Sequence, residues 1–313
     1  MVGTVTAHAF DAEKDSEALR KAMKGLGTDE KVVIDIIGAR TGAQLRELAT
    51  KYKSIFGRDL VDDLKSELSG NFKQACIDRF LTPAQFDATC LKNAIAGAGT
   101  DEDCLLEIFI TRSNEELKQI KEAYHTLFKK ELEKDVKGDT SGDFMRLCVS
   151  LLTGNRDQSN NTDPAAAAKE AGDLYKAGEG KIGTDEEKFN QIFCARNFAQ
   201  LNLIFNEYSK ISKKDIEKAV DSEMSGYLRV GMLGIIKTAR NKPAYFAELL
   251  HASMKGAGTN DKALIRLILS RCEIDMVEIK KEFQTKYGKS LKSWVEGDTS
   301  GDYKKFLLKL IGE

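Results

Sequence analysis

Apolar residues recur at helical spacing through the first eighty residues, and glycine-containing loops separate the periodic stretches. Val32, Val33, Ile36 and Ile37 fall on one side of a helix. The pattern predicts five short helices, at residues 15–23, from Thr28 onward, 44–56, 60–68 and 71–80. In the third helix, the residues expected to point inward are Leu45, Leu48, Tyr52 and Ile55. No convincing strand alternation is present, so the pattern predicts an all-α protein.

Polar residues and glycines mark the expected helix ends. We expect Thr28 to cap the second helix, and Thr184 with Glu187 to form a capping box at an equivalent place further along the chain. Gly70 is expected to end the fourth helix.

A loop motif recurs four times, as Gly-X-Gly-Thr in three copies and Lys-Ile-Gly-Thr in one. In each copy, an acid within the pattern acid-X-Ser-Gly follows the last loop glycine by 40 residues. The copies are residues 25–28 with Glu67, 97–100 with Asp139, 181–184 with Glu223, and 256–259 with Asp298. One such loop alone is more simply explained as a helix end, but the fixed register in four copies indicates a shared function.

Other residues keep the same register. Counted from the same glycine, an arginine follows at 13 residues and an aromatic ring at 25. The arginines are Arg40, Arg112, Arg196 and Arg271, and the rings are Tyr52, Tyr124, Tyr208 and Phe283. Such matches indicate four homologous modules, which predicts about twenty helices. A plain helical solenoid is the alternative for the helix pattern alone.

The paired loop and acid have the chemistry of a calcium site. Glycine permits backbone angles that turn successive carbonyls toward one point, and calcium takes six to eight oxygen ligands with loose geometry. A single carboxylate per site predicts weak binding, about 10⁻⁵ to 10⁻³ M, with positions left to water. A lipid phosphate that replaced this water would raise the apparent calcium affinity, because linkage is reciprocal. We therefore expect Ca²⁺ at several sites, up to four of this loop type.

Composition and charge exclude several classes of protein. The 313 residues are 42% hydrophobic and 31% charged, which are globular values. A net charge of −1 and a pI of about 6.4 argue against a nucleic-acid partner and against a permanent electrostatic membrane anchor. No apolar run approaches the length of a membrane span. Membrane attachment is therefore expected to depend on the ion.

The six cysteines form no Cys-X-X-Cys pair, and the N-terminus lacks a secretory signal pattern. Reduced thiols in a cytosol are the better interpretation. Cys76 and Cys148 share one register position and are expected to be small buried hydrophobes. The three histidines lie in no recognisable catalytic pattern, and no nucleotide-binding or hydrolase motif is present, so we do not expect an enzyme.

A polar stretch at residues 154–164 is expected only to connect, and it would divide the chain into halves 1–153 and 165–313. Pro83, Pro164 and Pro243 lie near the expected repeat boundaries, where helices should stop. The predicted organisation is a tail at 1–9, repeats at 10–81, 82–153, 165–240 and 241–313, and the linker at 154–164.

Residues 23–30 and 254–259, together with the acid-X-Ser-Gly element and the repeat arginine, closely resemble the annexin repeat signature. The resemblance extends from about residue 10 to 313. It implies four repeats of about five helices, arranged as a slightly curved disc. It also implies a convex face that binds calcium and docks reversibly on acidic phospholipid membranes, with roles in membrane organisation, trafficking or repair.

The resemblance also implies individual site residues. In repeats one, two and four the implied metal ligands are Met23, Gly25, Gly27 and Glu67; Ile95, Gly97, Gly99 and Asp139; and Met254, Gly256, Gly258 and Asp298. Repeat three departs from the motif, and its implied ligands are Gly178, Lys181, Gly183 and Glu223. The implied membrane-binding residues are Lys24, Leu26, Ala98, Ile182, Lys255 and Ala257.

Two alternatives are kept. One is a calcium-independent helical scaffold. The other is an ion-conducting channel, because the family's channel charges match Asp87, Glu107, Arg112 and Arg266, although Cys90 replaces one usual acid. A buried structural salt network is the simpler interpretation of these charges. The short tail predicts no tail-binding protein. We expect a cytoplasmic protein that joins membranes peripherally when calcium rises, with self-association on the bilayer and unconventional secretion left open.

Overall fold

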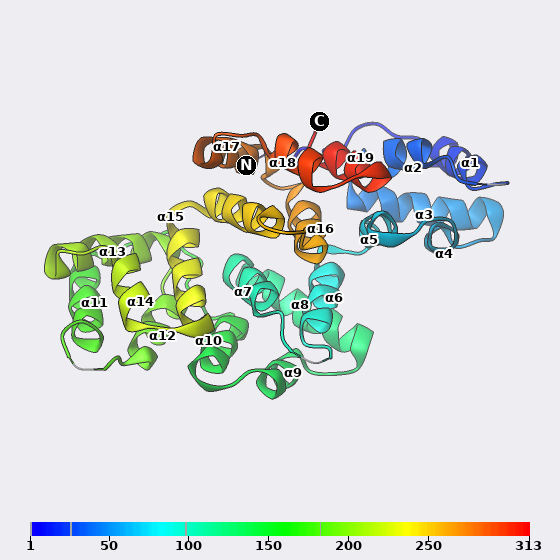
Figure 1. Cartoon of the computed structure of the whole chain (residues 1–313). Helices are drawn as coiled ribbons and strands as arrows, with labels where there is room; N and C mark the ends of the chain where they lie inside the picture. The colour runs from blue at the N-terminus through cyan, green and yellow to red at the C-terminus, as the bar shows by residue number, and fades with distance from the viewer. Residues whose placement is uncertain (1, 26, 98, 182) are drawn as a thin grey trace. The chain divides into compact units, whose positions relative to one another are not determined.

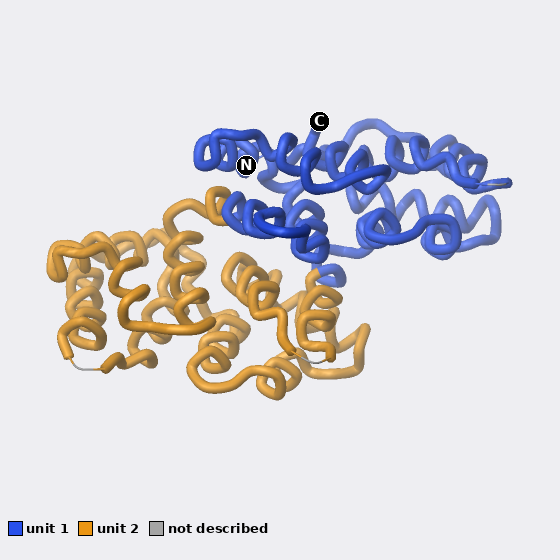
Figure 2. Tube along the Cα trace, in the orientation of Figure 1, with its two compact units in different colours: residues 1–86, 246–313 blue, residues 87–245 orange. Residues whose placement is uncertain are grey.

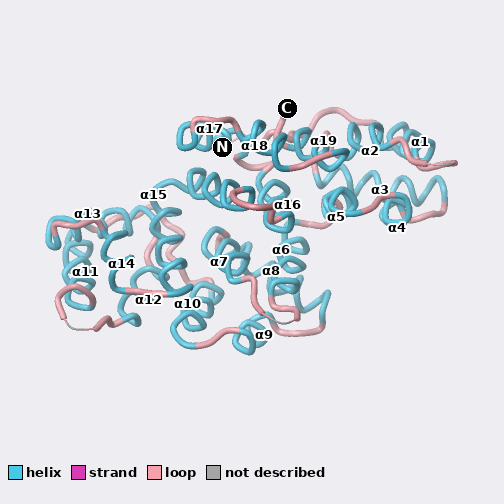
Figure 3. Tube along the Cα trace, viewed as in Figure 1, coloured by secondary structure: helices cyan, strands magenta, loops and turns pink. Residues whose placement is uncertain are grey.

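The computed structural model describes residues 2–25, 27–97, 99–181 and 183–313. Within them the chain forms nineteen helices and no strand. Figures 1 and 3 show how the helices follow one another along the chain. The predicted all-α fold is therefore confirmed.

The five helices of the first repeat lie close to their predicted positions. They are α1 (Ala12–Ala22), α2 (Glu30–Ile37), α3 (Gly42–Phe56), α4 (Leu60–Glu67) and α5 (Gly70–Asp78). Most are capped by side chains: Asp11 accepts hydrogen bonds at the start of α1, and Thr41 forms a capping box at the start of α3. Leu45, Leu48 and Tyr52 are fully buried, as the apolar periodicity predicts.

Several local predictions are wrong. The cap of α2 is Asp29, whose carboxylate accepts from the backbone N–H of Val32, and not Thr28. The capping box expected at Thr184 is likewise replaced by a cap at Asp185. Gly70 is the first residue of α5 rather than the end of α4.

Ile55 was expected to point inward, but it is 38% exposed. It lies in the last turn of α3, one residue before the helix ends at Phe56. Beyond this turn, Gly57 takes a left-handed conformation and redirects the chain. A regular apolar period therefore overestimated burial at the helix end.

The remaining helices follow the same order. In the second repeat they are α6 (Pro83–Ala94), α7 (Glu102–Thr111), α8 (Asn114–Phe128), α9 (Leu132–Asp139) and α10 (Gly142–Thr153). The next are α11 (Pro164–Ala177), α12 (Glu186–Ala195), α13 (Phe198–Ser212), α14 (Ile216–Glu223) and α15 (Gly226–Met254). The last four are α16 (Asp261–Arg271), α17 (Met276–Tyr287), α18 (Leu291–Asp298) and α19 (Gly301–Leu310).

The prolines lie where helices begin or break. Pro83 and Pro164 are first residues of their helices, where a missing N–H costs nothing. α15 contains Pro243 and is interrupted at Asn241, which has non-helical angles (φ −159°, ψ 92°). If the two parts of α15 are counted separately, the described residues form twenty helices, the number predicted.

The chain forms two compact units that do not follow the linker (Figure 2). Unit 1 comprises residues 1–86 and 246–313, and unit 2 comprises residues 87–245. The expected halves 1–153 and 165–313 are therefore wrong. In unit 1, α19 packs against α2 and α5. The rings of Phe72 and Phe306 pack edge to face, with 5.7 Å between their centroids. In unit 2, α10 packs against α12.

The linker within unit 2 is anchored by hydrogen bonds. The N–H of Asp157 donates to the carbonyl of Ala195 at 2.8 Å. Asn197 donates to the Asp157 carboxylate at 2.7 Å and to the carbonyl of Asn161 at 2.8 Å. The linker thus does more than connect, because it satisfies polar groups at the turn between α12 and α13.

Buried apolar side chains fill both units. Cys76 and Cys148 are fully buried, which confirms the prediction that they are small hydrophobes. Burial also raises the pKa of the Cys148 thiol to about 12, so this side chain stays protonated at neutral pH. Across the described residues, no helix combines the length and the apolar character needed to cross a bilayer.

Candidate metal centre in the interhelical loops

Each Gly-X-Gly-Thr loop joins the first two helices of its repeat and takes a backbone shape that glycine favours. The φ angles are 121° and 86° at Gly25 and Gly27, and 117° and 93° at Gly256 and Gly258. Those at Gly97 and Gly99 are 103° and 96°. Residues with a Cβ rarely adopt such angles. The sequence therefore uses glycine where the loop needs these conformations.

A backbone hydrogen bond closes each loop. The N–H of Asp29 donates to the carbonyl of Ala22 at 2.9 Å, and Asp101 donates to Ala94 at 2.8 Å. Asn260 and Ser253 form the same bond at 2.8 Å. The loop ends are thereby held together at the ends of two helices.

The loop threonines connect each loop to its distant acid. The hydroxyl distances to the carboxylate are 3.1 Å for Thr28 and Glu67, 2.7 Å for Thr100 and Asp139, 3.1 Å for Thr184 and Glu223, and 2.6 Å for Thr259 and Asp298. In repeats two to four the hydroxyl also donates to the carbonyl of the acid. All four acids therefore lie beside their own loops.

The threonine contact was missed in the sequence, where these residues were interpreted as helix caps. The signal was present, because threonine directly follows the loop glycine and an acidic or amide residue follows the threonine. That next residue caps the helix in the structure, as Asp29 and Asn260 show. The hydroxyl is then free to donate to the carboxylate.

The loops combine exposed glycines with buried anchors. Met23 and Met254 are buried, whereas the glycines of loops one, two and four are exposed. Lys24, Lys181, Lys255 and Ala257 are also exposed. Ile95 and three of the acids are half-buried, and Glu67 is exposed. The suggested membrane residues Leu26, Ala98 and Ile182 lie outside the described residues.

The third loop differs in length and shape. The N–H of Asp185 closes it onto the carbonyl of Ala177 at 2.7 Å, across one more residue than in the other loops. Gly183 has a φ of 80°, whereas Gly178 has a φ of −119° and is buried. A Cβ added to Gly178 would lie 3.6 Å from Cγ of Glu223. The structure therefore brings the predicted residues Gly178 and Glu223 together.

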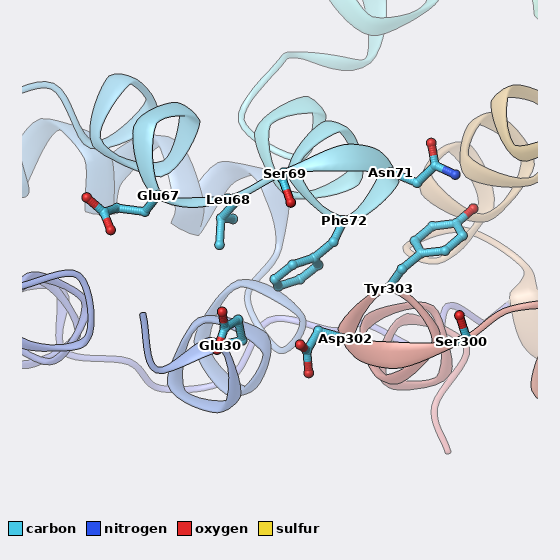
Figure 4. Close-up of a pocket in the computed structure, with 9 residues that line it drawn as sticks. All are labelled: Glu30, Glu67, Leu68, Ser69, Asn71, Phe72, Ser300, Asp302 and Tyr303. Atoms are coloured by element: carbon cyan, nitrogen blue, oxygen red, sulfur yellow. The ribbon is translucent and has the colours of Figure 1, made fainter. Parts of the chain in front are cut away.

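Unit 1 contains a polar cleft of about 340 Å³, and Glu67 is one of the residues that line it. Figure 4 shows Glu67 and Ser69 on one side of it, with Glu30 and Asp302 across from them. The rest of the lining consists of Leu68, Asn71, Phe72, Ser300 and Tyr303. Glu67 thus belongs both to this acidic cleft and to the contact with Thr28.

The donor set of each loop suits calcium better than a softer metal. In the part of the chain that the structure describes, no three His, Cys, Asp or Glu side chains gather in a way that could hold a metal. The oxygen donors available at each loop are backbone carbonyls and the single carboxylate that the threonine contacts. Hard oxygen ligands of this kind are those that calcium prefers.

Three of the four charges considered for a channel form a compact salt network in unit 2. Arg112 donates to both oxygens of Asp87, at 2.7 and 2.9 Å, and lies 3.7 Å from Glu107. The side chains of Arg112 and Asp87 are 4% and 7% exposed. Arg266 belongs to unit 1. For the three residues of unit 2, the geometry favours a structural role.

The family model described as Annexin matches residues 14–78, 86–151, 169–235 and 245–310. The chain belongs to the annexin family. It is 51% identical to annexin A4 of Homo sapiens over 311 residues, which cover 99% of this chain and 98% of that protein. It is 50% identical to annexin A11 of Oryctolagus cuniculus over 311 residues, again 99% of this chain, but it spans only 62% of that protein's length.

Solved annexin structures share the fold. A structure titled annexin III matches with a TM-score of 0.98 and 44% identity, covering 100% of this chain and 98% of the other. A structure of calcium-bound annexin (Sm)1 matches with a TM-score of 0.88 and 34% identity, covering 99% and 93%. The predicted resemblance to the annexin family is thus confirmed for both sequence and fold.

Proposed function

We propose that this annexin binds calcium ions in its interhelical loops and uses them to dock reversibly on acidic phospholipid membranes. The observation that carries the proposal is the hydrogen bond between each loop threonine and an acid 39 residues further along the chain, present in all four repeats. It places one carboxylate beside each loop. The family membership and the calcium-bound state of one similar annexin support the same ion.

In this proposal the loops supply carbonyl oxygens and the acids supply charge. The proposed ligands are Met23, Gly25, Gly27 and Glu67; Ile95, Gly97, Gly99 and Asp139; Gly178, Lys181, Gly183 and Glu223; and Met254, Gly256, Gly258 and Asp298. Bound calcium would supply positive charge and open coordination positions to lipid phosphate oxygens. The exposed side chains of Lys24, Lys255 and Ala257 would meet the headgroup region.

Weak sites act together when they face one membrane. Each lipid-bound site raises the effective concentration of lipid at the next, so several weak contacts give firm but reversible binding. We propose a binding protein of the cytoplasm rather than an enzyme, with peripheral attachment when calcium rises. Its division into repeats at 10–81, 82–153, 165–240 and 241–313 belongs to the same proposal.

The test is sedimentation with phosphatidylserine vesicles at increasing calcium. Wild-type protein should sediment with calcium and be released by EDTA. The combined change of Glu67, Asp139, Glu223 and Asp298 to alanine should abolish sedimentation, because each loop loses its carboxylate. Helical content by circular dichroism should stay unchanged.

A matched control removes the same amount of charge from the same four helices. Its substitutions to alanine are at Asp62, Glu133, Glu217 and Glu296, on α4, α9, α14 and α18. This control should sediment like the wild type. If none of the three proteins sedimented with vesicles at any calcium concentration, the calcium-independent helical scaffold would be supported instead. Unchanged sedimentation of the first variant would refute the proposed ligands.

A further inference from the structure

The third loop carries a carboxylate that the other loops lack. Glu179 follows Gly178, at the end of α11, and its side chain is only 10% exposed. The loop is otherwise held by turns: the N–H of Gly180 donates to the carbonyl of Tyr175 at 2.8 Å, and that of Lys181 donates to Gly178 at 3.0 Å. A half-buried carboxylate within a candidate metal loop calls for a physical reason.

The repeat tyrosine provides that reason. In repeats one and two, Tyr52 and Tyr124 donate to Asp63 and Asp135, each at 2.7 Å. Both aspartates lie eleven residues after the tyrosine, on the fourth helix of the repeat. The acid that satisfies the buried tyrosine is thus outside the calcium loop in these two repeats.

Repeat three replaces this arrangement. Ala219 lies eleven residues after Tyr208 and cannot accept a hydrogen bond through its side chain. Tyr208 instead donates to Oε2 of Glu179 at 2.9 Å, and Lys214 donates to Oε1 at 2.5 Å. Tyr208 is on α13, and Lys214 lies in the turn between α13 and α14. Both oxygens of Glu179 therefore connect the loop to the body of the repeat.

The two hydrogen bonds from Tyr208 and Lys214 to Glu179 form a tether, which acts on the residues proposed as ligands. Glu179 directly follows Gly178, and Gly178 lies against Glu223. The loop is one residue longer than the others, and a longer loop has more conformations to lose when it orders around an ion. A contact that already fixes the loop lowers this cost of binding.

We infer that Glu179 is a positioning residue for the third calcium site: its contacts with Tyr208 and Lys214 hold the loop carbonyls against Glu223 and so set the calcium affinity of repeat three. The inference rests on the proposed function. Both oxygens of Glu179 are turned to Tyr208 and Lys214, so the inference gives this side chain a positioning role and does not count it among the ligands.

The experiment isolates repeat three. In a chain with Glu67, Asp139 and Asp298 changed to alanine, only the third site keeps its acid. Glu179→Ala in this background should raise the calcium concentration for half-maximal sedimentation with phosphatidylserine vesicles by roughly tenfold, as losses of outer-shell partners do. Glu179→Gln and Tyr208→Phe should have smaller effects, since each leaves part of the tether. Circular dichroism confirms folding, and these two milder variants keep the test decisive if Glu179→Ala is unstable.

A matched control separates positioning from general stability. In a chain that keeps only Asp139, Asp135→Ala removes the partner of Tyr124 without touching a loop. This change should lower thermal stability but leave the calcium requirement of repeat two unchanged. An unchanged calcium requirement in all three repeat-three variants would overturn the inference. If Glu223→Ala fails to abolish sedimentation of the repeat-three background, the proposed function itself is wrong.

Discussion

Each of the four loop threonines donates its hydroxyl to a carboxylate 39 residues away, and this single contact defines the candidate site. The bond holds the carboxylate beside the loop before any ion arrives. In the fourth repeat it is shortest, 2.6 Å between Thr259 Oγ1 and Asp298 Oδ2. The carboxylate is thus preorganised, and a ligand that is already in place need not be ordered when calcium binds.

Removing one such hydroxyl should weaken one site. In a chain that keeps only Asp298 among the four acids, Thr259→Val should raise the calcium requirement for vesicle sedimentation about fivefold, the equivalent of one hydrogen bond. Thr259→Ser, which keeps the hydroxyl, should behave like the parent. Equal calcium requirements for valine and serine would show that the bond does not support the site.

The sequence predicted the partnership between loop and acid but not the bond that makes it. The constant spacing between Gly27 and Glu67, repeated in all modules, was sufficient to connect the two. The role of Thr28 was not predictable from capping preferences, because threonine and aspartate both suit a helix start. Only the structure shows that Asp29 is the cap, because its side chain accepts a hydrogen bond from the backbone N–H of Val32.

At the scale of helices, the repeat arginine joins elements of its own module. Arg40 pairs with Asp15, Arg112 with Asp87, and Arg196 with Glu170, each an acid on the first helix of the repeat. In repeat four, Phe246 lies under the guanidinium of Arg271 at 4.4 Å, and Asp275 takes the ion pair. The register predicted the arginines, but their partners could not be predicted, because the fourth acid comes from a different part of its repeat.

Breaking the most buried of these ion pairs in unit 2 should lower the free energy of unfolding more than breaking a more exposed pair. Asp87→Ala leaves the Arg112 guanidinium, 4% exposed, without its main partner, and should lower the free energy of unfolding by about 3–5 kcal/mol. Asp15→Ala should cost less, because Arg40 is 22% exposed and water can solvate it. Urea unfolding followed by circular dichroism measures both. A larger loss for Asp15→Ala would contradict this ranking by burial.

At the scale of the whole molecule, the order of repeats in sequence does not give their grouping. Repeats one and four share unit 1, through α19 against α2 and α5, while repeats two and three share unit 2. The polar stretch at 154–164 suggested a boundary, but it lies within unit 2. Composition indicates where a chain is polar, and only the matching of apolar surfaces, such as Phe72 with Phe306, decides which modules pack together.

A crystal structure of the protein grown at high calcium tests the central claim most directly. We predict calcium ions in all four loops, about 2.3–2.6 Å from backbone carbonyl oxygens and from the carboxylates of Glu67, Asp139, Glu223 and Asp298. Anomalous scattering would identify the ions. Loops without calcium in such crystals, or ions bound elsewhere while these carboxylates contact only their threonines, would contradict the account.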